Sequence, residues 1–443
     1  MIVYPEMQSD METKLSLITK HITEDSEVKL TSLAHLLNKR SLIESFYMLK
    51  KDKAPGIDGV TFQEYETNLD ENINNLVARM KKQAYKPLPV LRVYIPKGEG
   101  KRRPLGLPAL EDKIVQKGMT RILNAIYEPI FLDCSYGFRT GRNCHQALNA
   151  LDTAIMTKPV NHVIDADIKG FFDHVDHAWL KRMLEEKIAD KNFLRLIMRF
   201  LKAGVMEEGK WYDTEEGTPQ GGLISPVLAN VYLHYVLDLW VEKGLAQQCT
   251  GYVKVVRYCD DFVILVQYKH EAQKILEVLE ERMNKFGLEL APDKTNLLEF
   301  GRYARINAEK KSKKPDTFDF LSFTHYSDKT RSGKFKVGRK TKRKKLSTKA
   351  KELNLWMKRT RNQEKLKDWW ETLAAKLRGH YQYYGVSGNY PALTSYYKLA
   401  IRLAHKWVNR RSQKNSMNWK EFQAYLQTFP LPKPRICHNL YTL

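Results

Sequence analysis

The chain has 443 residues, of which 43% are hydrophobic, so it is long enough for two to three domains and too apolar for an intrinsically disordered protein. It contains no apolar run near the roughly 18 residues that span a bilayer, and residues 1–20 lack the apolar core of a signal peptide, so a cytoplasmic location is expected. The net charge of +23 indicates a polyanionic partner, either nucleic acid or an anionic membrane. Tyr and Trp interleave with the basic stretches and can stack on bases, which favours nucleic acid; a merely solubilising surface is the alternative.

The N-terminal third of the chain is predicted to be helical and then to form a hairpin. Residues 1–50 show helical periodicity, with Leu42 and Phe46 on one face. Residues 90–96 are typical of a strand. Residues 97–103 (Lys-Gly-Glu-Gly-Lys-Arg-Arg) follow as a basic hairpin tip whose glycines supply turn conformations.

Two further strands end at acidic residues. Residues 161–167 are predicted to form a short strand that ends at Asp167. Residues 253–266 alternate on either side of Asp260-Asp261, which predicts a β-hairpin with both acids at its tip.

The C-terminal part changes from mixed to helical and basic. Residues 272–286 have the apolar spacing of a helix, and residues 301–316 are polar and are expected to be a loop. Residues 331–349 hold ten Lys or Arg and no acid, and the segments 393–407 and 419–426 have helical spacing. We therefore expect an α+β body to about residue 325 and a basic helical domain after it.

The acids suggest a magnesium site. Adjacent strand residues point to opposite sides, so one acid of the pair can bind metal while the other supports it. Magnesium prefers carboxylate and phosphate oxygens, and phosphoryl transfer through two metals about 3.5–4 Å apart needs carboxylates from separate segments. Asp167 would be the second supplier to Asp260, although an Asp-Asp pair alone is also common in solvated turns. The five cysteines include no C-x2-C pair, so a zinc site is not expected.

A second special segment is Gly217-Thr-Pro-Gln-Gly-Gly222, followed by Ser225-Pro226. Three glycines and a proline predict a rigid bend that a base pair could approach closely. A plain loop before a helix is the alternative.

Four segments occur in the order of polymerase motifs A to D: Asp167-Ile-Lys-Gly-Phe-Phe172, Gly217-Thr-Pro-Gln-Gly-Gly222, Tyr258-Cys-Asp-Asp261, and Gly287-Leu-Glu-Leu with Lys294-Thr295. Further matches flank them: Pro55-Gly-Ile-Asp-Gly59, Tyr94-Ile-Pro-Lys97, Arg103-Pro-Leu-Gly106, Ser135-Tyr-Gly-Phe-Arg139, Phe320-Leu-Ser-Phe-Thr-His325 and Arg378-Gly-His-Tyr-Gln-Tyr-Tyr-Gly385. Over roughly residues 45–440 the chain resembles the bacterial group II intron-encoded reverse transcriptase/maturase family.

The resemblance implies an α+β right-hand polymerase with fingers, a palm with an antiparallel sheet, and a helical thumb. Residues 1–50 would be an N-terminal helical extension, 51–325 the fingers and palm, and 326–443 the basic thumb or maturase (X) domain with a short tail. The implied function is RNA-directed DNA polymerisation together with maturase activity that assists intron splicing and retrohoming. A domesticated relative that acts in DNA repair or phage defence is the alternative. The implied partners are an RNA template, such as a group II intron RNA, a DNA primer or target, and dNTPs, but no membrane; the bacterial protein would associate with the nucleoid when acting on DNA.

Functional roles carry over motif by motif. Asp167 and Asp260, with Asp261 beside them, would be catalytic and would bind two Mg²⁺ ions. The residues expected at the nucleotide are Lys97 and Arg103 on the triphosphate, Phe172 against the sugar, Gln220 on the nucleotide or template, and Lys294 at the leaving pyrophosphate. For Phe171 and Phe172, a plain core role is the alternative. The residues expected on RNA phosphates are Arg339, Lys340, Lys342, Arg343, Lys344 and Lys345.

Three positions depart from the family pattern. Cys259 stands where Ala is usual, Thr140 replaces a Pro, and Ser322 replaces a Gly of the primer-grip segment. If residue 322 needs a positive φ, Ser costs about 1 kcal/mol there. Residues 430–440 are too short and proline-rich for an endonuclease, so a member without that domain is expected, which starts from a supplied 3′-OH.

Overall fold

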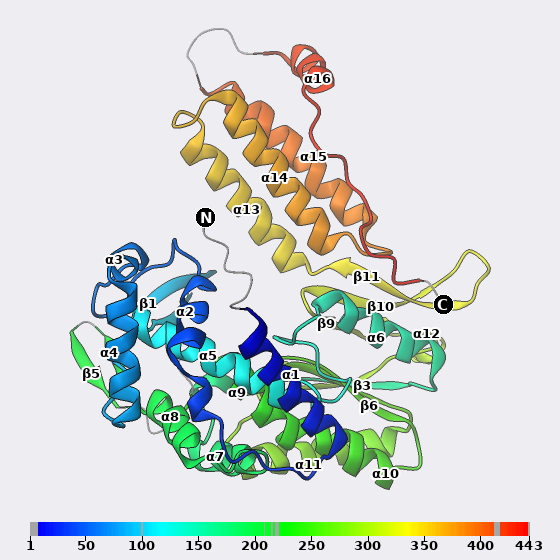
Figure 1. Cartoon of the computed structure of the whole chain (residues 1–443). Helices are drawn as coiled ribbons and strands as arrows, with labels where there is room; N and C mark the ends of the chain where they lie inside the picture. Colours follow the sequence, from blue (N-terminus) through cyan, green and yellow to red (C-terminus); the bar gives the residue numbers. More distant parts are fainter. Residues whose placement is uncertain are drawn as a thin grey trace. The chain divides into compact units, whose positions relative to one another are not determined.

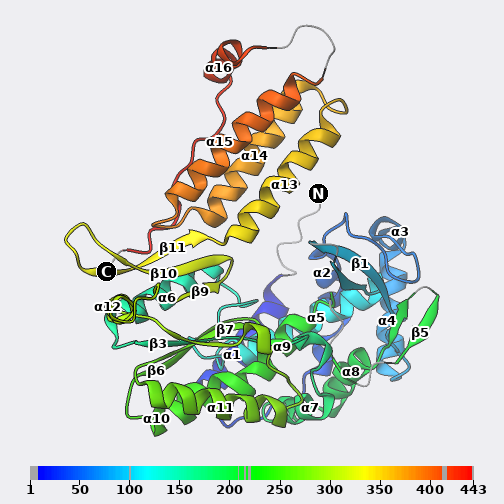
Figure 2. The same cartoon turned by 180° about the vertical axis from the view of Figure 1, so that it is seen from behind.

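The computed structural model describes residues 8–98, 101–207, 209–213, 216–217, 221–411 and 417–441. It is a mixed α/β structure of two compact units (Figures 1 and 2). The first unit takes in residues up to Ala147 together with Ala166–Ile264 and His270–Thr295, and the second takes in Leu148–Asp165, Leu265–Lys269 and Asn296–Leu443. In the part of the chain that the structure describes, no helix is both long enough and apolar enough to cross a membrane.

The N-terminal helices of the first unit bury apolar side chains, and two of them begin at a capping residue. They are α1 (Gln8–Glu24), α2 (Lys39–Tyr47), α3 (Phe62–Thr67), α4 (Leu69–Lys81) and α5 (Leu110–Tyr127). Asn38 caps α2, and Thr61 forms a capping box with Glu64 at the start of α3. Phe46 is fully buried and stacks on Phe62 with ring centroids 4.1 Å apart. The described residues before Lys51 belong to the first compact unit.

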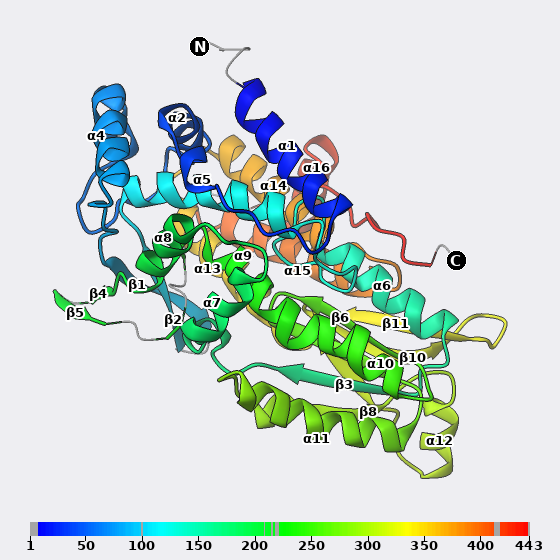
Figure 3. The same ribbon diagram turned by 60° about the horizontal axis from the view of Figure 1, so that its bottom comes forward.

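A four-stranded sheet has the order β2-β1-β4-β5. Its strands are β1 (Val90–Gly98), β2 (Lys101–Leu107), β4 (Val205–Glu207) and β5 (Lys210–Tyr212). The strands β1 and β2 pair antiparallel from Leu91↔Leu107 to Gly98↔Lys101, which confirms the predicted hairpin. The strand β1 also pairs parallel with β4. Figure 3 shows helix α8 (Lys191–Leu201) near this sheet and next to α7 (His177–Glu185).

The helices that follow lead to the acidic hairpin. Helix α9 (Ser225–Leu233) continues into the π-helical turns η4 (His234–Asp238) and η5 (Trp240–Leu245) and the short α10 (Ala246–Gln248). A second sheet has the order β6-β7-β3-β8, with β6 (Val253–Tyr258), β7 (Asp261–Val266), β3 (His162–Asp167) and β8 (Asn296–Glu299). Helix α11 (Lys269–Lys285) ends before Gly287, whose φ of +69° closes it as predicted.

The second unit contains a three-stranded sheet and a helical bundle. The sheet has the order β11-β10-β9, with β9 (Thr317–Phe320), β10 (Phe323–Lys329) and β11 (Phe335–Thr341). Helices α13 (Arg343–Thr360), α14 (Leu366–Tyr384) and α15 (Tyr390–Val408) lie side by side in Figures 1 and 2, and α6 (Cys144–Thr157), α12 (Ala304–Lys310) and α16 (Trp419–Thr428) complete the helices.

The domain boundary expected near residue 325 stays a prediction; residue 325 lies within β10, and the compact units divide at several points, the last of them between Thr295 and Asn296. One prediction about this region is wrong. The expected loop at 301–316 contains helix α12. Ala304 and Ala308 lie one helical turn apart and are both buried, and this short apolar spacing was overlooked because the segment is mostly polar.

Candidate active site

The acidic hairpin is formed as predicted, with β6 ending at Tyr258 and β7 beginning at Asp261. The turn between them places Cys259 at φ +60°, a left-handed conformation that non-glycine residues rarely adopt. Strand β3 neighbours β7, and the Asn161 N–H at its start donates to the Val266 carbonyl at the end of β7 (3.1 Å). This bond joins the start of β3 to the end of β7, so the two strands run antiparallel and the end of β3 at Asp167 faces the start of β7 at Asp261, next to Asp260.

A buried arginine holds this turn. The Arg257 side chain is completely buried and makes a two-pronged ion pair with the equally buried Asp238 (Nη2–Oδ2 2.6 Å, Nε–Oδ1 2.7 Å). Its Nη1 donates to the Cys259 carbonyl and to Asn230 Oδ1, both at 3.0 Å, and its Nη2 donates to Ser135 Oγ at 2.8 Å. Burial alone would lower the pKa of Arg257, but the Asp238 carboxylate outweighs it and the pKa is raised. The π-helical turn η4 ends at Asp238 and so supplies the partner.

The segment Ser135-Tyr-Gly-Phe-Arg139 packs directly on the hairpin. The Tyr136 N–H donates to the Arg257 carbonyl (2.9 Å), and the Arg257 N–H donates to the Cys134 carbonyl (2.8 Å). A Cβ added at Gly137 would collide with the Cys259 backbone nitrogen. A glycine is therefore required there, because the two backbones lie too close for any side chain.

Glycines of the Gly217–Gly222 segment make similar close approaches. A Cβ at Gly217 (φ +86°) would meet the Asp173 carbonyl oxygen at 2.8 Å and that of Phe172 at 2.9 Å, just after Asp167. A Cβ at Gly221 (φ +116°) would collide with the carbonyl oxygen of Gly106 on β2. The segment thus contacts both the hairpin β1–β2 and the residues after β3. Gln220 lies outside the described residues.

The two phenylalanines after Asp167 have different environments. Phe171 is buried (2% exposed) and lies edge-on to Phe172 with centroids 5.3 Å apart, whereas Phe172 is only half-buried. The core role therefore falls to Phe171, and Phe172 is the ring that remains available to a ligand.

The Lys294 side chain is not merely solvated, because its ammonium group forms an ion pair with Asp167 Oδ2. No group of three or more His, Cys, Asp or Glu side chains is arranged to hold a metal among the described residues. Magnesium held by one or two carboxylates plus substrate phosphates needs no such group, so Asp167, Asp260 and Asp261 fit this mode. A metal at Asp167 Oδ2 would share that carboxylate with Lys294.

The structure describes only part of the basic hairpin that is predicted to bind the nucleotide. Arg103 is exposed on β2, opposite Ile95. Lys97 belongs to β1, but its side chain lies outside the described residues.

The predicted RNA-contacting cluster loses one member. Arg339 is fully buried, paired with Asp152 of α6, and its guanidinium lies 5.3 Å from the Tyr441 ring centroid. It therefore cannot contact RNA phosphates, and its assignment to the cluster was wrong. The members that remain at the surface are Lys340, Lys342, Arg343, Lys344 and Lys345.

Residue 322 has the backbone conformation that the family's glycine suggested. Ser322 has φ +69° and follows Leu321 at φ +49°. The Lys342 N–H donates to the Ser322 carbonyl (3.0 Å), and the Tyr383 hydroxyl donates to the Leu321 carbonyl (3.1 Å). These bonds fix the strained link between β9 and β10.

Sequence reasoning missed Arg257, Asp238 and Asn230 as parts of the site. One signal was available for Arg257, which is a charged residue at a position that strand alternation and its apolar neighbours mark as buried. Nothing in the sequence indicated Asp238 as its partner, since the two are joined only by the fold.

Comparison with known proteins agrees with these motifs. A family model described as reverse transcriptase (RNA-dependent DNA polymerase) matches residues 95–325. Group II intron-encoded protein LtrA of Lactococcus lactis subsp. cremoris is 32% identical in an alignment 351 residues long, which covers 66% of this chain and 58% of LtrA. Protein YkfC of Escherichia coli K12 is 35% identical over 276 residues, covering 55% of this chain and 72% of YkfC. An uncharacterized 91 kDa protein in the cob intron of Schizosaccharomyces pombe is 36% identical over 208 residues, covering 47% of this chain and 25% of that protein.

This chain spans 58% of the length of LtrA and 72% of that of YkfC. The family model covers more than half of the chain, and the motifs lie in the order and the spatial arrangement described above. The chain therefore belongs to the reverse transcriptase (RNA-dependent DNA polymerase) family, and within it to the relatives of the group II intron-encoded proteins.

Proposed function

We propose that this protein is an RNA-directed DNA polymerase that copies RNA into DNA by two-metal-ion nucleotidyl transfer. The observation that supports the proposal is that Asp167 ends β3 and Asp261 begins the neighbouring strand β7, with Asp260 in the turn before it. Gly137 brings its segment to backbone distance of Cys259, Gly217 brings the segment 217–222 to backbone distance of the residues after β3, and Gly221 brings it against β2.

The reaction joins a primer 3′-oxygen to the α-phosphorus of a dNTP and releases pyrophosphate. Reverse transcriptases use divalent metal ions, and we assign two Mg²⁺ to Asp167 and Asp260, with Asp261 beside them. When bound, such ions stabilise charge on the attacking and leaving oxygens. Lys294, which forms an ion pair with Asp167, would neutralise or protonate the leaving pyrophosphate.

Substrate selection falls to the neighbouring groups. Lys97 and Arg103 would hold the triphosphate from the β1–β2 hairpin, and Gln220 would contact the nucleotide or template. The half-buried Phe172 ring would lie under C2′ of the sugar and exclude a 2′-hydroxyl sterically.

A maturase role accompanies the polymerase. The name of LtrA associates it with a group II intron, and this chain carries an exposed basic cluster at Lys340 and at the start of α13. We infer that this cluster binds the phosphates of a group II intron RNA, which this protein would help to splice. A folded intron RNA flanking the open reading frame would support that partner, whereas its absence would favour the alternative role in repair or phage defence.

The polymerase proposal is tested by primer extension on poly(rA)/oligo(dT) with magnesium. Asp260→Ala and Asp167→Ala should remove most synthesis and leave RNA affinity nearly intact, because affinity comes from Lys and Arg elsewhere. Glu281→Ala, on the exposed face of α11, is the matched control and should extend normally. Substantial synthesis by either Asp variant would contradict the assignment.

A further inference from the structure

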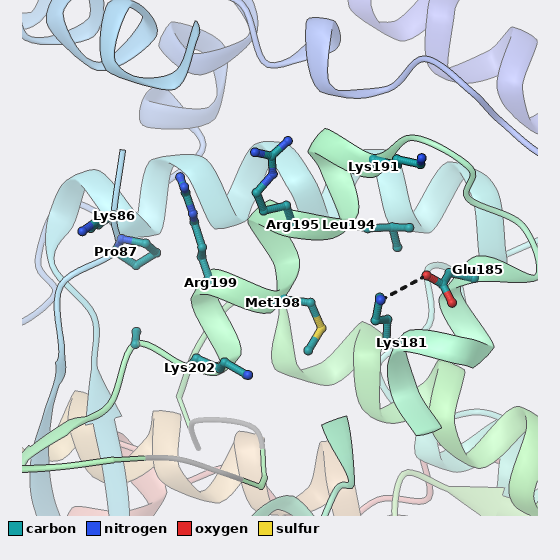
Figure 4. Close-up of a pocket in the computed structure, with 11 residues that line it drawn as sticks. Lys86, Pro87, Lys181, Glu185, Lys191, Leu194, Arg195, Met198, Arg199 and Lys202 are labelled. Atoms are coloured by element: carbon teal, nitrogen blue, oxygen red, sulfur yellow. Dashed lines mark ion pairs between the residues drawn. The ribbon is translucent and has the colours of Figure 1, made fainter. Parts of the chain in front are cut away.

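A cavity of about 770 Å³ lies in the first unit, between helices α7 and α8 and the segment before β1 (Figure 4). Its rim carries six cationic side chains and one carboxylate, Glu185. The cations are Lys86, Lys181, Lys191, Arg195, Arg199 and Lys202. Among the described residues of the rim, Lys181 forms an ion pair with Glu185 at 3.5 Å, and the six cations against one carboxylate leave the rim with a large positive excess.

The charge on this rim follows from the two faces of α8. Its buried face carries Phe193, Ile197 and Phe200, which pack into the core. Lys191 and Arg195 are one helical turn apart on the opposite face, with Lys202 just past the helix end. Successive cations on this face can therefore follow the successive phosphates of one nucleic-acid strand.

Two arginines of the rim are held in place before any ligand arrives. Arg199 Nη1 donates to the carbonyls of Gln83 (2.9 Å) and Tyr85 (2.7 Å) and so ties the segment before β1 to α8. Arg195 donates to the Gln83 side chain and to Asn192 Oδ1 (2.5 Å). Because these side chains are already ordered, less conformational entropy is lost when a ligand binds.

The floor of the cavity is apolar, unlike its rim. Leu194 is buried (6% exposed), and Met198, Pro87 and Ala203 complete the floor. Figure 4 shows the Met198 side chain in the space between Lys181 and Lys202. An apolar floor below a cationic rim suits a nucleobase with its phosphates, and a base must leave a duplex to reach such a floor.

This cavity lies away from the hairpin tip that is predicted to bind the triphosphate. Lys86 and Pro87 precede β1, whereas the predicted triphosphate-binding hairpin tip lies at the far end of that strand. Nine strand residues span about 30 Å, so the cavity does not serve the incoming nucleotide.

We propose that the cavity binds an unpaired segment of RNA, with phosphates on Lys86, Lys191 and Lys202 and a base on the floor at Met198 and Leu194. The choice of RNA rests on the proposed function, because an RNA-directed enzyme holds RNA beyond its active centre.

The test uses single-stranded poly(U) that contains 4-thiouridine, and its binding is measured over a range of salt concentrations. The triple variant Lys86→Gln, Lys191→Gln and Lys202→Gln should lower the salt slope of log affinity by about two. A fourfold rise in salt would then weaken the wild type about 20-fold more than the variant. The control triple Lys269→Gln, Lys274→Gln and Lys285→Gln on α11 removes the same charge and should leave the slope unchanged.

Ultraviolet cross-linking supplies an independent readout. Thiouridine should cross-link within residues 191–203, and Met198→Glu should abolish that cross-link by placing a carboxylate on the floor. A wild-type slope in the pocket triple, an equal fall in both triples, or cross-links only elsewhere would overturn the proposal. Equal binding of single-stranded DNA would overturn the choice of RNA. Primer extension by the wild type is scored separately, so failure of the polymerase proposal remains distinguishable from failure of this one.

Discussion

Replacing Arg257 by Lys tests whether the buried ion pair positions the acidic turn. The guanidinium makes five hydrogen bonds to four partners, which are Asp238, Asn230, Cys259 and Ser135. Lysine keeps the positive charge but offers only three donors, so at least two of these bonds are lost.

The energies indicate which part of the site should give way. A buried acceptor left unpaired costs roughly 1–3 kcal/mol, so Arg257→Lys should destabilise the protein by roughly 2–6 kcal/mol. The left-handed Cys259 costs about 1–2 kcal/mol, and a hydrogen bond from a charged donor is worth about 1.5–3 kcal/mol. The bond from Arg257 to the Cys259 carbonyl can therefore offset the strain of the turn. Without it we expect the turn to relax and shift Asp260, and a misplacement of about 1 Å can cost about 100-fold in rate.

The assay is single-turnover primer extension, expressed per folded molecule and run below the melting temperature of each variant. Leu76→Ala is the matched control, because Leu76 is fully buried on α4 and its loss costs roughly 2–5 kcal/mol without touching the network. Arg257→Lys should lose much more rate than Leu76→Ala at similar stability. Equal rates per folded molecule would refute a positioning role and leave Arg257 as a purely structural group.

Three further outcomes are expected. Phe172→Ala should sharply lower the ratio of dNTP to rNTP incorporation. An unchanged ratio would show that another residue excludes the 2′-hydroxyl. Ser322→Gly should raise the free energy of unfolding by roughly 0.5–1 kcal/mol, because relief of the backbone strain at φ +69° exceeds the extra entropy that glycine gives the unfolded chain. Thermal denaturation measures this change, and a loss of stability would contradict the prediction. Burial lowers the pKa of His234 to about 4, so only the unfolded chain takes up this proton as pH falls from 6.5 towards 4, and stability is lost in that window. Between pH 7 and pH 5 the wild type should therefore lose about 2 kcal/mol more than His234→Phe in urea unfolding, and equal losses would show that His234 is not the group responsible.

Local patterns in the sequence determined most of the elements that carry the site. The hairpin around Asp260 was predictable because strand alternation and a polar turn are encoded by adjacent residues. The end of α11 at Gly287 was equally local, since it depends on the conformational freedom of one glycine. The positive φ at Ser322 was a conditional expectation from the family's glycine, because serine itself does not favour that conformation. The placement of Asp167 beside Asp260 followed from motif order and agrees with the strand neighbours β3 and β7.

Only the tertiary structure decided which charged residues are buried. Arg339 stands in a run of basic residues that composition assigns to the surface, yet on β11 it shares the buried face with Val337 and Thr341, while Lys340 faces out. Strand alternation predicts that two-residue period, but the buried position is stable only because Asp152, far away in the chain, supplies the opposite charge. The same holds for Arg257 and Asp238, which are brought together by a π-helical turn and a strand. A buried charge needs a partner, and a sequence does not specify a partner that only folding brings near.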